Sequence, residues 1–313
     1  MGELMRLFGE ALPISHFDKS KLSKDGIMMT TDNEEGVERR NTMHFRIKSD
    51  AFVPGGGRPN TINIDNWHNF LDKDGVPSSP LIVEGANIFT TVEARQKLFE
   101  EGGVAIVKDS SANKCGVITS SDEIACSMLV SEEEFMAVKE ELVEDVLIRI
   151  RMLAEFEAKL LFREYNNYPG SLPHFSERIS NAINAATDAC ADALADQQHG
   201  DELFDKVFPV IRDNLPKKLD EMAWGRVKDR FPLQYQRNAI ASTLASRLVY
   251  KEGIHFIEAQ HPHDLAKLAF AHYGQEQEVA ALAKRVEAGD AEAVAHALKL
   301  LRKGGTRTAL NIF

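Results

Sequence analysis

The sequence is poor in cysteine, in long apolar stretches and in basic residues, and each shortage excludes a class of protein. Its 313 residues include three cysteines, too few and too scattered for a disulfide framework or a Cys-x-x-Cys metal site. So few cysteines suit a reducing compartment, and a cytoplasmic location is expected. The chain has no run of about 18 apolar residues, so no transmembrane helix and no membrane partner are expected.

Basic residues are fewer than acidic ones, 37 against 48, which gives a net charge of −11. An acidic surface repels the phosphate backbone of DNA and RNA, so nucleic acid is not expected as a partner. Apolar residues make up 43% of the chain and charged residues 27%, which is typical of a globular protein rather than a disordered or fibrous one. A chain of this length is expected to form about two domains.

The residue pattern of the sequence changes near residue 130, and this change predicts a first domain over 1–130 and a second over 131–313. The first part has short apolar runs between clusters of Gly, Pro, Asn and Asp, and one stretch with helical spacing that starts at Thr90 or Thr91. A strand, a helix and a further strand in this order predict an α/β domain with a parallel sheet. The expected strands are 45–53, 80–84, 104–107 and, more weakly, 27–30, with a helix over 91–101.

The second part has the 3.6-residue period of helices almost throughout, which predicts an all-α domain. Ser131 followed by Glu134 predicts a capping box, in which each side chain bonds the other residue's backbone N–H. The helix that it opens is expected to run about 30 residues to the Pro169-Gly170 stop, with Arg149, Arg151 and Arg163 on its solvent face. A further helix is expected from about Ser176. Helices are also expected over 3–12, 275–288 and 291–302, the last capped by Asp290.

Three polar loops follow the predicted strands, at the end of a parallel sheet where ligands bind. Gly55-Gly56-Gly57-Arg58 follows the first strand, and it either lets the backbone approach a ligand, such as a phosphate, or simply makes a turn. Glu84-Gly85-Ala86-Asn87 follows the second strand, and it either presents polar groups to a ligand or ends the strand, with Asn87 capping the next helix. The loop that begins at Asp109 is long and dense in hydrogen-bonding groups.

Four histidines near the end of the chain offer weaker evidence for a metal site. A His-x-His pair can place two ligands on one side of a strand, but a proline separates the pair here and no cysteine or clear carboxylate partner lies nearby. A zinc site is therefore not expected. The four residues are His255, His261, His263 and His272.

Taken as an ordered set, these motifs resemble the nucleotide-binding domain of the glutamate dehydrogenase family of amino-acid dehydrogenases. They are Val-Pro-Gly-Gly-Gly-Arg-Pro (53–59), Ile-Val-Glu-Gly-Ala-Asn (82–87) and Ser-Ala-Asn-Lys-Cys-Gly-Val-Ile-Thr-Ser-Ser-Asp-Glu (111–123). Two later stretches, 162–173 and 245–250, are similar to the helical tail of the large NAD-specific branch. The resemblance covers most of the chain and implies a partial Rossmann-like sheet followed by an all-helical C-terminal domain.

The resemblance also implies a role for particular residues. Asn87, Asn113 and the glycines Gly55 and Gly56 would contact the cofactor, NAD. Ser120 would hold a substrate carboxylate, and Val117 would line the pocket. The implied reaction is the oxidative deamination of L-glutamate to 2-oxoglutarate and ammonia, in an enzyme that is a homo-oligomer.

The sequence departs from the family pattern in two respects. The family loop usually has small residues where Lys114 and Cys115 stand. The chain also shows no glycine-rich dinucleotide fingerprint, and none of its residues matches the catalytic lysines or the catalytic aspartate of the family. The chain is therefore expected to be the C-terminal portion of a longer enzyme, with no catalytic residue of its own and no turnover in isolation. The alternative is a non-catalytic helical module for oligomerisation or regulation.

Overall fold

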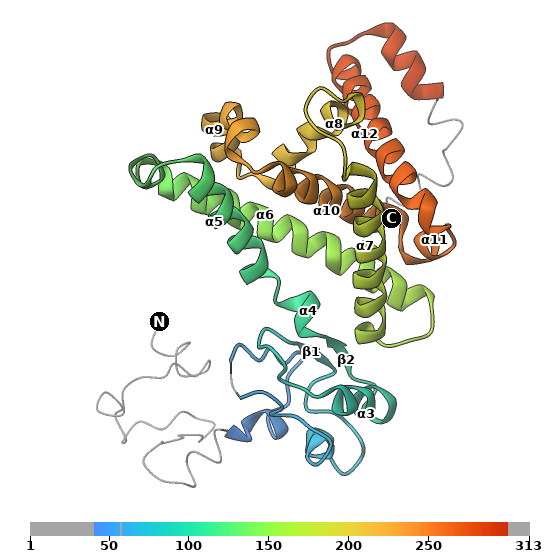
Figure 1. The fold of residues 1–313 in the computed structure, drawn as a ribbon. Coiled ribbons are helices and arrows are strands. Elements are labelled where there is room, and N and C mark those ends of the chain that lie inside the picture. Colours follow the sequence, from blue (N-terminus) through green and yellow to red (C-terminus); the bar gives the residue numbers. More distant parts are fainter. Residues whose placement is uncertain (1–40, 57, 300–313) are drawn as a thin grey trace. The chain divides into compact units, whose positions relative to one another are not determined.

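The computed structural model describes residues 41–56 and 58–299, and the chain divides into two compact units between Asn113 and Lys114 (Figure 1). The helix expected over 3–12 and the strand expected over 27–30 lie outside the described residues. Helix α5 (Cys115–Leu129) packs on α6 (Glu132–Asn167) in the second unit. The domain boundary at residue 130, which assigns α5 to the first domain, stays a prediction.

The first unit contains a parallel pair of strands, β1 (Leu81–Val83) and β2 (Ala105–Val107), joined by helix α3 (Val92–Gly102). Leu81 pairs with Ala105 and Val83 with Val107, so the strands run in register. Thr91 caps α3 by accepting a hydrogen bond from the backbone N–H of Ala94. The predicted strand-helix-strand unit is therefore confirmed. The other described elements of this unit are short helical turns: η2 (Met43–Phe45), η3 (Trp67–Phe70) and α4 (Asp109–Ala112).

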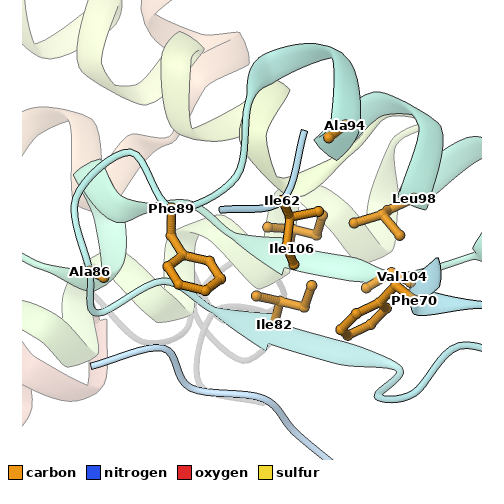
Figure 2. Packing of buried hydrophobic residues seen from close by; sticks show 9 residues of the cluster. All are labelled: Ile62, Phe70, Ile82, Ala86, Phe89, Ala94, Leu98, Val104 and Ile106. Atoms are coloured by element: carbon orange, nitrogen blue, oxygen red, sulfur yellow. The ribbon is translucent and has the colours of Figure 1, made fainter. Parts of the chain in front are cut away.

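The core of the first unit is a cluster of nine buried apolar side chains around this strand pair. Figure 2 shows Ile82 and Ile106 from the two strands beside Leu98 of α3, with Phe70 and Phe89 closing the cluster. Because this packing fixes β1, β2 and α3 together, the loops that leave the two strands start from a rigid base.

The strand predicted over 45–53 is wrong. Its first residue belongs to the turn η2, and only Phe52 pairs in strand fashion, through a parallel bridge to Ile82. Residues 46–51 are exposed, and the Lys48 ammonium donates to the backbone oxygens of Val76 and Pro77 and pairs with Asp72. Ile47, Ala51 and Val53 alternate along the sequence as on one face of a strand, but all three side chains are exposed in the structure. The alternation therefore buries no face, and the stretch pairs in strand fashion only at Phe52.

The second unit is a bundle of helices, as the sequence predicts. The central contact is between α7 (Leu172–Leu194) and α10 (Leu233–Glu252), with α12 (Leu265–Glu287) beside both. Among the described residues, no helix has the length and apolar character needed to cross a membrane. The other elements are α8 (Glu202–Val207), η4 (Phe208–Asn214), α9 (Lys217–Arg230), α11 (Ile254–Glu258) and η5 (Pro262–Asp264), and residues 291–299 are also helical.

The predicted helix starts at Ser131 and Asp290 are confirmed, whereas the helix predicted over 275–288 begins earlier, at Leu265. Ser131 and Glu134 form the capping box of α6. Asp290 accepts hydrogen bonds from the N–H groups of Glu292 and Ala293, as a helix cap does. The helix predicted from about Ser176 begins earlier, at Leu172, because Ser171 caps it and Pro173 is tolerated in a first helical turn.

The prediction that Arg149 lies on the solvent face of α6 is wrong. Its side chain is only 12% exposed and forms an ion pair with the buried Asp122 of α5. Burial raises the pKa of Asp122, and the Arg149 guanidinium opposes that rise. A carboxylate this deeply buried needs a cation, and α6 supplies it across the helix contact.

Candidate functional site

Three loops leave the carboxyl ends of parallel elements in the first unit: one after Phe52, one after β1 and one after β2. The backbone joins Phe52 to β1 through two hydrogen bonds, to the oxygen of Leu81 and from the N–H of Val83. The first two loops touch, since a Cβ added to Gly85 would lie 3.1 Å from the oxygen of Pro54. This is the edge of an open α/β sheet at which ligands bind.

The Glu84 side chain is hydrogen bonded within the first unit and is not available to a ligand. It is fully buried and accepts two hydrogen bonds from Arg95, at 2.5 Å and 3.3 Å. It also accepts from the backbone N–H of Asp109, at 3.2 Å. Asp109 in turn accepts from the N–H of Ile88, so the network ties the loops after β1 and β2 to α3.

Sequence reasoning missed Arg95 because it sits in an ordinary amphipathic helix. The signal that could have found it is Glu84 itself. A carboxylate directly after a buried strand has no access to water, so it requires a cation close by in the fold. Arg95 lies eleven residues away, on the helix that follows the loop.

The two asparagines that the family pattern assigns to the cofactor lie together. Asn113 Nδ2 donates to Asn87 Oδ1 across 2.8 Å, which joins the loop after β1 to the loop after β2. Asn87 is exposed and does not cap α3, because Thr91 does so. An amide has two donors and an acceptor oxygen, so this pair still has Asn87 Nδ2 and Asn113 Oδ1 to offer a ligand.

Gly55 and Gly56 border open space. A Cβ added to either residue would meet no atom within 4 Å among the described residues. Neither glycine has a positive φ, so the turn itself does not demand them. A backbone without side chains here leaves room for a ligand to approach the loop closely.

Val117 and Ser120 lie in the second unit, near the start of α5. The Val117 side chain is 73% exposed, unusual for a large apolar residue. The Ser120 hydroxyl donates to the oxygen of Gly116 at 2.8 Å, and Thr119 and Ser121 make the same kind of bond to their own helix. To donate to a substrate carboxylate, the Ser120 hydroxyl must turn away from Gly116.

The histidines considered for zinc fall on three elements: His255 on α11, His261 and His263 at η5, and His272 on α12. Within the part of the chain that the structure describes, no group of three or more His, Cys, Asp or Glu side chains has the arrangement needed to hold a metal ion.

Comparison with known proteins places the sequence in a family. The sequence profile of the Glutamate/Leucine/Phenylalanine/Valine dehydrogenase family matches residues 3–196. The chain is 34% identical over 284 residues to an NAD-specific glutamate dehydrogenase of Saccharomyces cerevisiae, and 32% identical over 272 residues to a probable NAD-specific glutamate dehydrogenase of Schizosaccharomyces pombe. A glutamate dehydrogenase 2 of Dictyostelium discoideum is 32% identical over 278 residues.

Each of these alignments covers 80% of the chain but only 24% to 26% of the relative. The chain thus spans about a quarter of the length of the curated relatives that it matches. No solved structure matches the chain significantly.

Proposed function

Since the chain belongs to the Glutamate/Leucine/Phenylalanine/Valine dehydrogenase family, we propose that it forms part of an NAD-dependent glutamate dehydrogenase. The reaction is the oxidative deamination of L-glutamate to 2-oxoglutarate and ammonia. The relatives named NAD-specific glutamate dehydrogenase support both the substrate and the cofactor. The chain contributes binding groups to this reaction, and we assign no catalytic residue within it.

The observation that carries the proposal is the hydrogen bond between Asn113 and Asn87. It fixes two side-chain amides at the carboxyl ends of β1 and β2, where a dinucleotide binds in this fold class. The free donor of Asn87 and the free acceptor of Asn113 match the carboxamide and ribose groups of a nicotinamide nucleotide. Gly55 and Gly56 fit the same ligand, because the space beside them is open.

The bound NAD would accept a hydride from the α-carbon of the substrate, and the chain's own residues orient the two partners. In this proposal Asn113 contacts the nicotinamide side of the cofactor and Asn87 holds the Asn113 side chain in place. Because Asn113 Nδ2 already donates to Asn87, we assign its Oδ1 as the atom that accepts a hydrogen bond from the cofactor.

We assign substrate binding to α5. The Ser120 hydroxyl donates to a carboxylate of glutamate once it turns from the Gly116 oxygen, and the exposed Val117 contacts the aliphatic part of the substrate. The homo-oligomer and the cytoplasmic location remain predictions from the sequence.

The purified 313-residue chain is expected to show no glutamate-dependent formation of NADH. Its sequence has no Gly-x-Gly-x-x-Gly fingerprint, and the groups assigned above bind and orient without activating substrate or water. The check is absorbance of NADH with saturating L-glutamate and NAD. If turnover copurifies with the chain, the chain has a catalytic group of its own, and the assignment of purely binding roles to its residues is wrong.

A chimera tests the proposed function itself. The segment of the Saccharomyces cerevisiae relative that aligns with the chain is replaced by the chain. The chimera is expected to reduce NAD with L-glutamate, and Asn113→Ala is expected to raise the KM for NAD about tenfold through loss of one hydrogen bond. Asn238→Ala, on the exposed surface of α10, is the matched control. A folded chimera without glutamate-dependent activity would refute the proposal.

A second candidate, a helical module that joins copies of the chain, is favoured by an apolar line on α6. Ile148, Met152 and Phe156 are spaced four residues apart and are 59%, 40% and 43% exposed, on the same side of the helix. Light scattering tests it. A defined oligomer that Ile148→Asp dissociates supports association through α6, and a monomer at all concentrations contradicts it.

A further inference from the structure

The second unit has a small polar cavity of about 180 Å³ at the junction of α6, α10 and α11. It is lined by Arg163 and Glu164 near the end of α6, by Tyr168 just after that helix, and by residues around the junction of α10 and α11, namely Lys251 of α10, Gly253 between the helices and His255 of α11. These residues fall in the stretches that the proposed function leaves without a role.

A buried carboxylate in this cavity lacks a hydrogen bond. The Glu164 residue is 3% exposed, and its Oε2 has no hydrogen-bond partner among the described residues. The nearest nitrogen atoms of basic side chains are Arg163 Nη2, 3.5 Å from Oε1, and His255 Nε2, 3.5 Å from Oε2. Both distances are too long for a strong charged hydrogen bond, so the carboxylate can still accept one from a ligand.

The surrounding contacts hold His255 so that it cannot close this gap. The Arg178 guanidinium lies 3.4 Å from His255 Nδ1, and an arginine can only donate. Arg178 is itself held by Glu258, at 2.5 Å, and the Tyr168 ring packs on the imidazole at 3.8 Å between centroids. The imidazole is therefore clamped on one edge and one face, with Nε2 directed to the Glu164 side.

Gly253 keeps the cavity open. Its φ of +88° and ψ of 169° belong to a region that is nearly exclusive to glycine. A Cβ at this position would overlap the Arg163 guanidinium and lie 3.1 Å from Glu164 Oε1. The glycine thus lets the backbone pass directly against the two charged groups.

The charges of the lining balance, which favours a neutral ligand that carries both signs. The side chains of Arg163 and Lys251 are positive, and those of Glu164 and Glu252 are negative. We propose that the cavity binds a free α-amino acid, with its ammonium group on Glu164 Oε2 and its carboxylate toward Arg163 and Lys251. An ammonium supplies the missing donor, and the carboxylate beside it keeps the complex neutral.

The test uses the full chain and a panel of the standard L-amino acids at pH 7, without L-glutamate. That omission, together with the absence of NAD, separates this test from that of the proposed function. Binding is followed by calorimetry and by the backbone amide signal of Gly253. At least one amino acid is expected to bind with a dissociation constant of about 1 mM or tighter and to shift the Gly253 signal.

Three comparisons test which charged groups of the cavity and of the ligand are needed for binding. Glu164→Gln keeps the shape of the side chain, removes its charge and is expected to weaken binding at least tenfold. Arg163→Gln is expected to weaken it to a similar degree, and Glu155→Gln, on the exposed face of the same helix, should have no effect. The amine and the carboxylic acid that correspond to the best binder should each bind at least tenfold more weakly than the amino acid.

The proposal is overturned if no member of the panel binds, or if Glu164→Gln binds as tightly as the wild-type chain. It is equally overturned if the amine or the acid alone binds as well as the amino acid, since the cavity would then recognise a single charge.

Discussion

At the scale of single residues, buried charge decides the local structure of the first unit. Glu84 has no exposed side-chain surface, and Arg95 is its cation. A buried pair of this kind adds little net stability over an apolar pair, but removal of one partner leaves an uncompensated charge in the core. The loop after β1, which presents Asn87, therefore depends on Arg95.

Replacement of Arg95 by leucine is expected to lower the free energy of unfolding of the first unit by about 3–5 kcal/mol, because Glu84 is left buried without its cation. Chemical denaturation measures the effect. The matched control is Lys97→Gln on the same helix, since Lys97 makes only an exposed pair with Glu101 and should change little. Equal stability of the Arg95 variant and the wild-type chain would show that the network does not hold the loop.

His44 makes the same unit sensitive to pH. Its ring lies among Phe45, Phe52 and Phe89, and burial lowers its pKa from 6.5 to about 4. Its Nε2 is buried without a hydrogen-bond partner. Because the unfolded chain takes up a proton near pH 6.5 and the folded chain only near pH 4, stability falls as the pH is lowered through this window.

The expected loss between pH 7.5 and pH 4.5 is about 1–2 kcal/mol, less than the full shift because the ring is partly exposed. The check compares the wild-type chain with His44→Leu over this range by denaturant unfolding. The difference in stability between the two proteins should vary with pH, in favour of the leucine variant at the acidic end. A difference that is constant with pH would contradict the shift.

At the scale of elements, side chains at the ends of helices determine where the helices begin and which neighbours they contact. The capping box of α6 satisfies two backbone N–H groups, and Arg226 of α9 donates to both oxygens of Glu134. That guanidinium lowers the pKa of Glu134 to about 2. One cap thus links the start of the longest described helix to α9.

Substitution of Ser131 by alanine is expected to destabilise the second unit by about 1 kcal/mol, the usual cost of a lost cap. Ser127→Ala serves as the control, because Ser127 donates only to the oxygen of Ile124 in its own helix. Thermal unfolding followed by circular dichroism separates the two. If both variants melt with the wild-type chain, the capping box does not contribute to stability.

Local chemistry explains which elements could be predicted. The strands at 81–83 and 105–107, the cap at Thr91 and the capping box at Ser131 follow from short-range patterns, and all are confirmed. The strand predicted over 45–53 failed because its alternating apolar residues Ile47, Ala51 and Val53 stay exposed in the structure, so alternation alone did not identify a buried strand. Arg149 failed because its partner, Asp122, lies 27 residues away on another helix. The hydrophobic period of a helix predicts which face is buried. It does not predict which charged side chain on that face will be paired with a partner from another helix.

The candidate site was predictable only as a family pattern. Strand order indicates that Asn87 and Asn113 lie at one edge of the sheet, but not that they hydrogen bond. The Glu164 cavity could not be predicted at all, because it joins residues almost ninety positions apart through the backbone of Gly253. No local pattern reports such a contact.

At the scale of the whole molecule, the second unit has its own core. Helices α7 and α10 bury much of their apolar surface against each other, and α6 and α12 pack on both of them. Residues 114–313 expressed alone are therefore expected to give a helical circular dichroism spectrum and one cooperative unfolding transition. A polypeptide that lacks cooperative unfolding would show that the second unit depends on the first.

The amide pair at the edge of the sheet can be tested directly for binding to the nicotinamide half of the cofactor. Nicotinamide mononucleotide is titrated into the isotopically labelled chain, and the side-chain amide signals of Asn87, Asn113 and, as a control, Asn238 are followed. We expect saturable shifts at Asn87 and Asn113, none at Asn238, and loss of the Asn87 shift in Asn113→Ala. Shifts of equal size with AMP, or no shift at either asparagine, would contradict the assignment of this pair to the nicotinamide half of the cofactor.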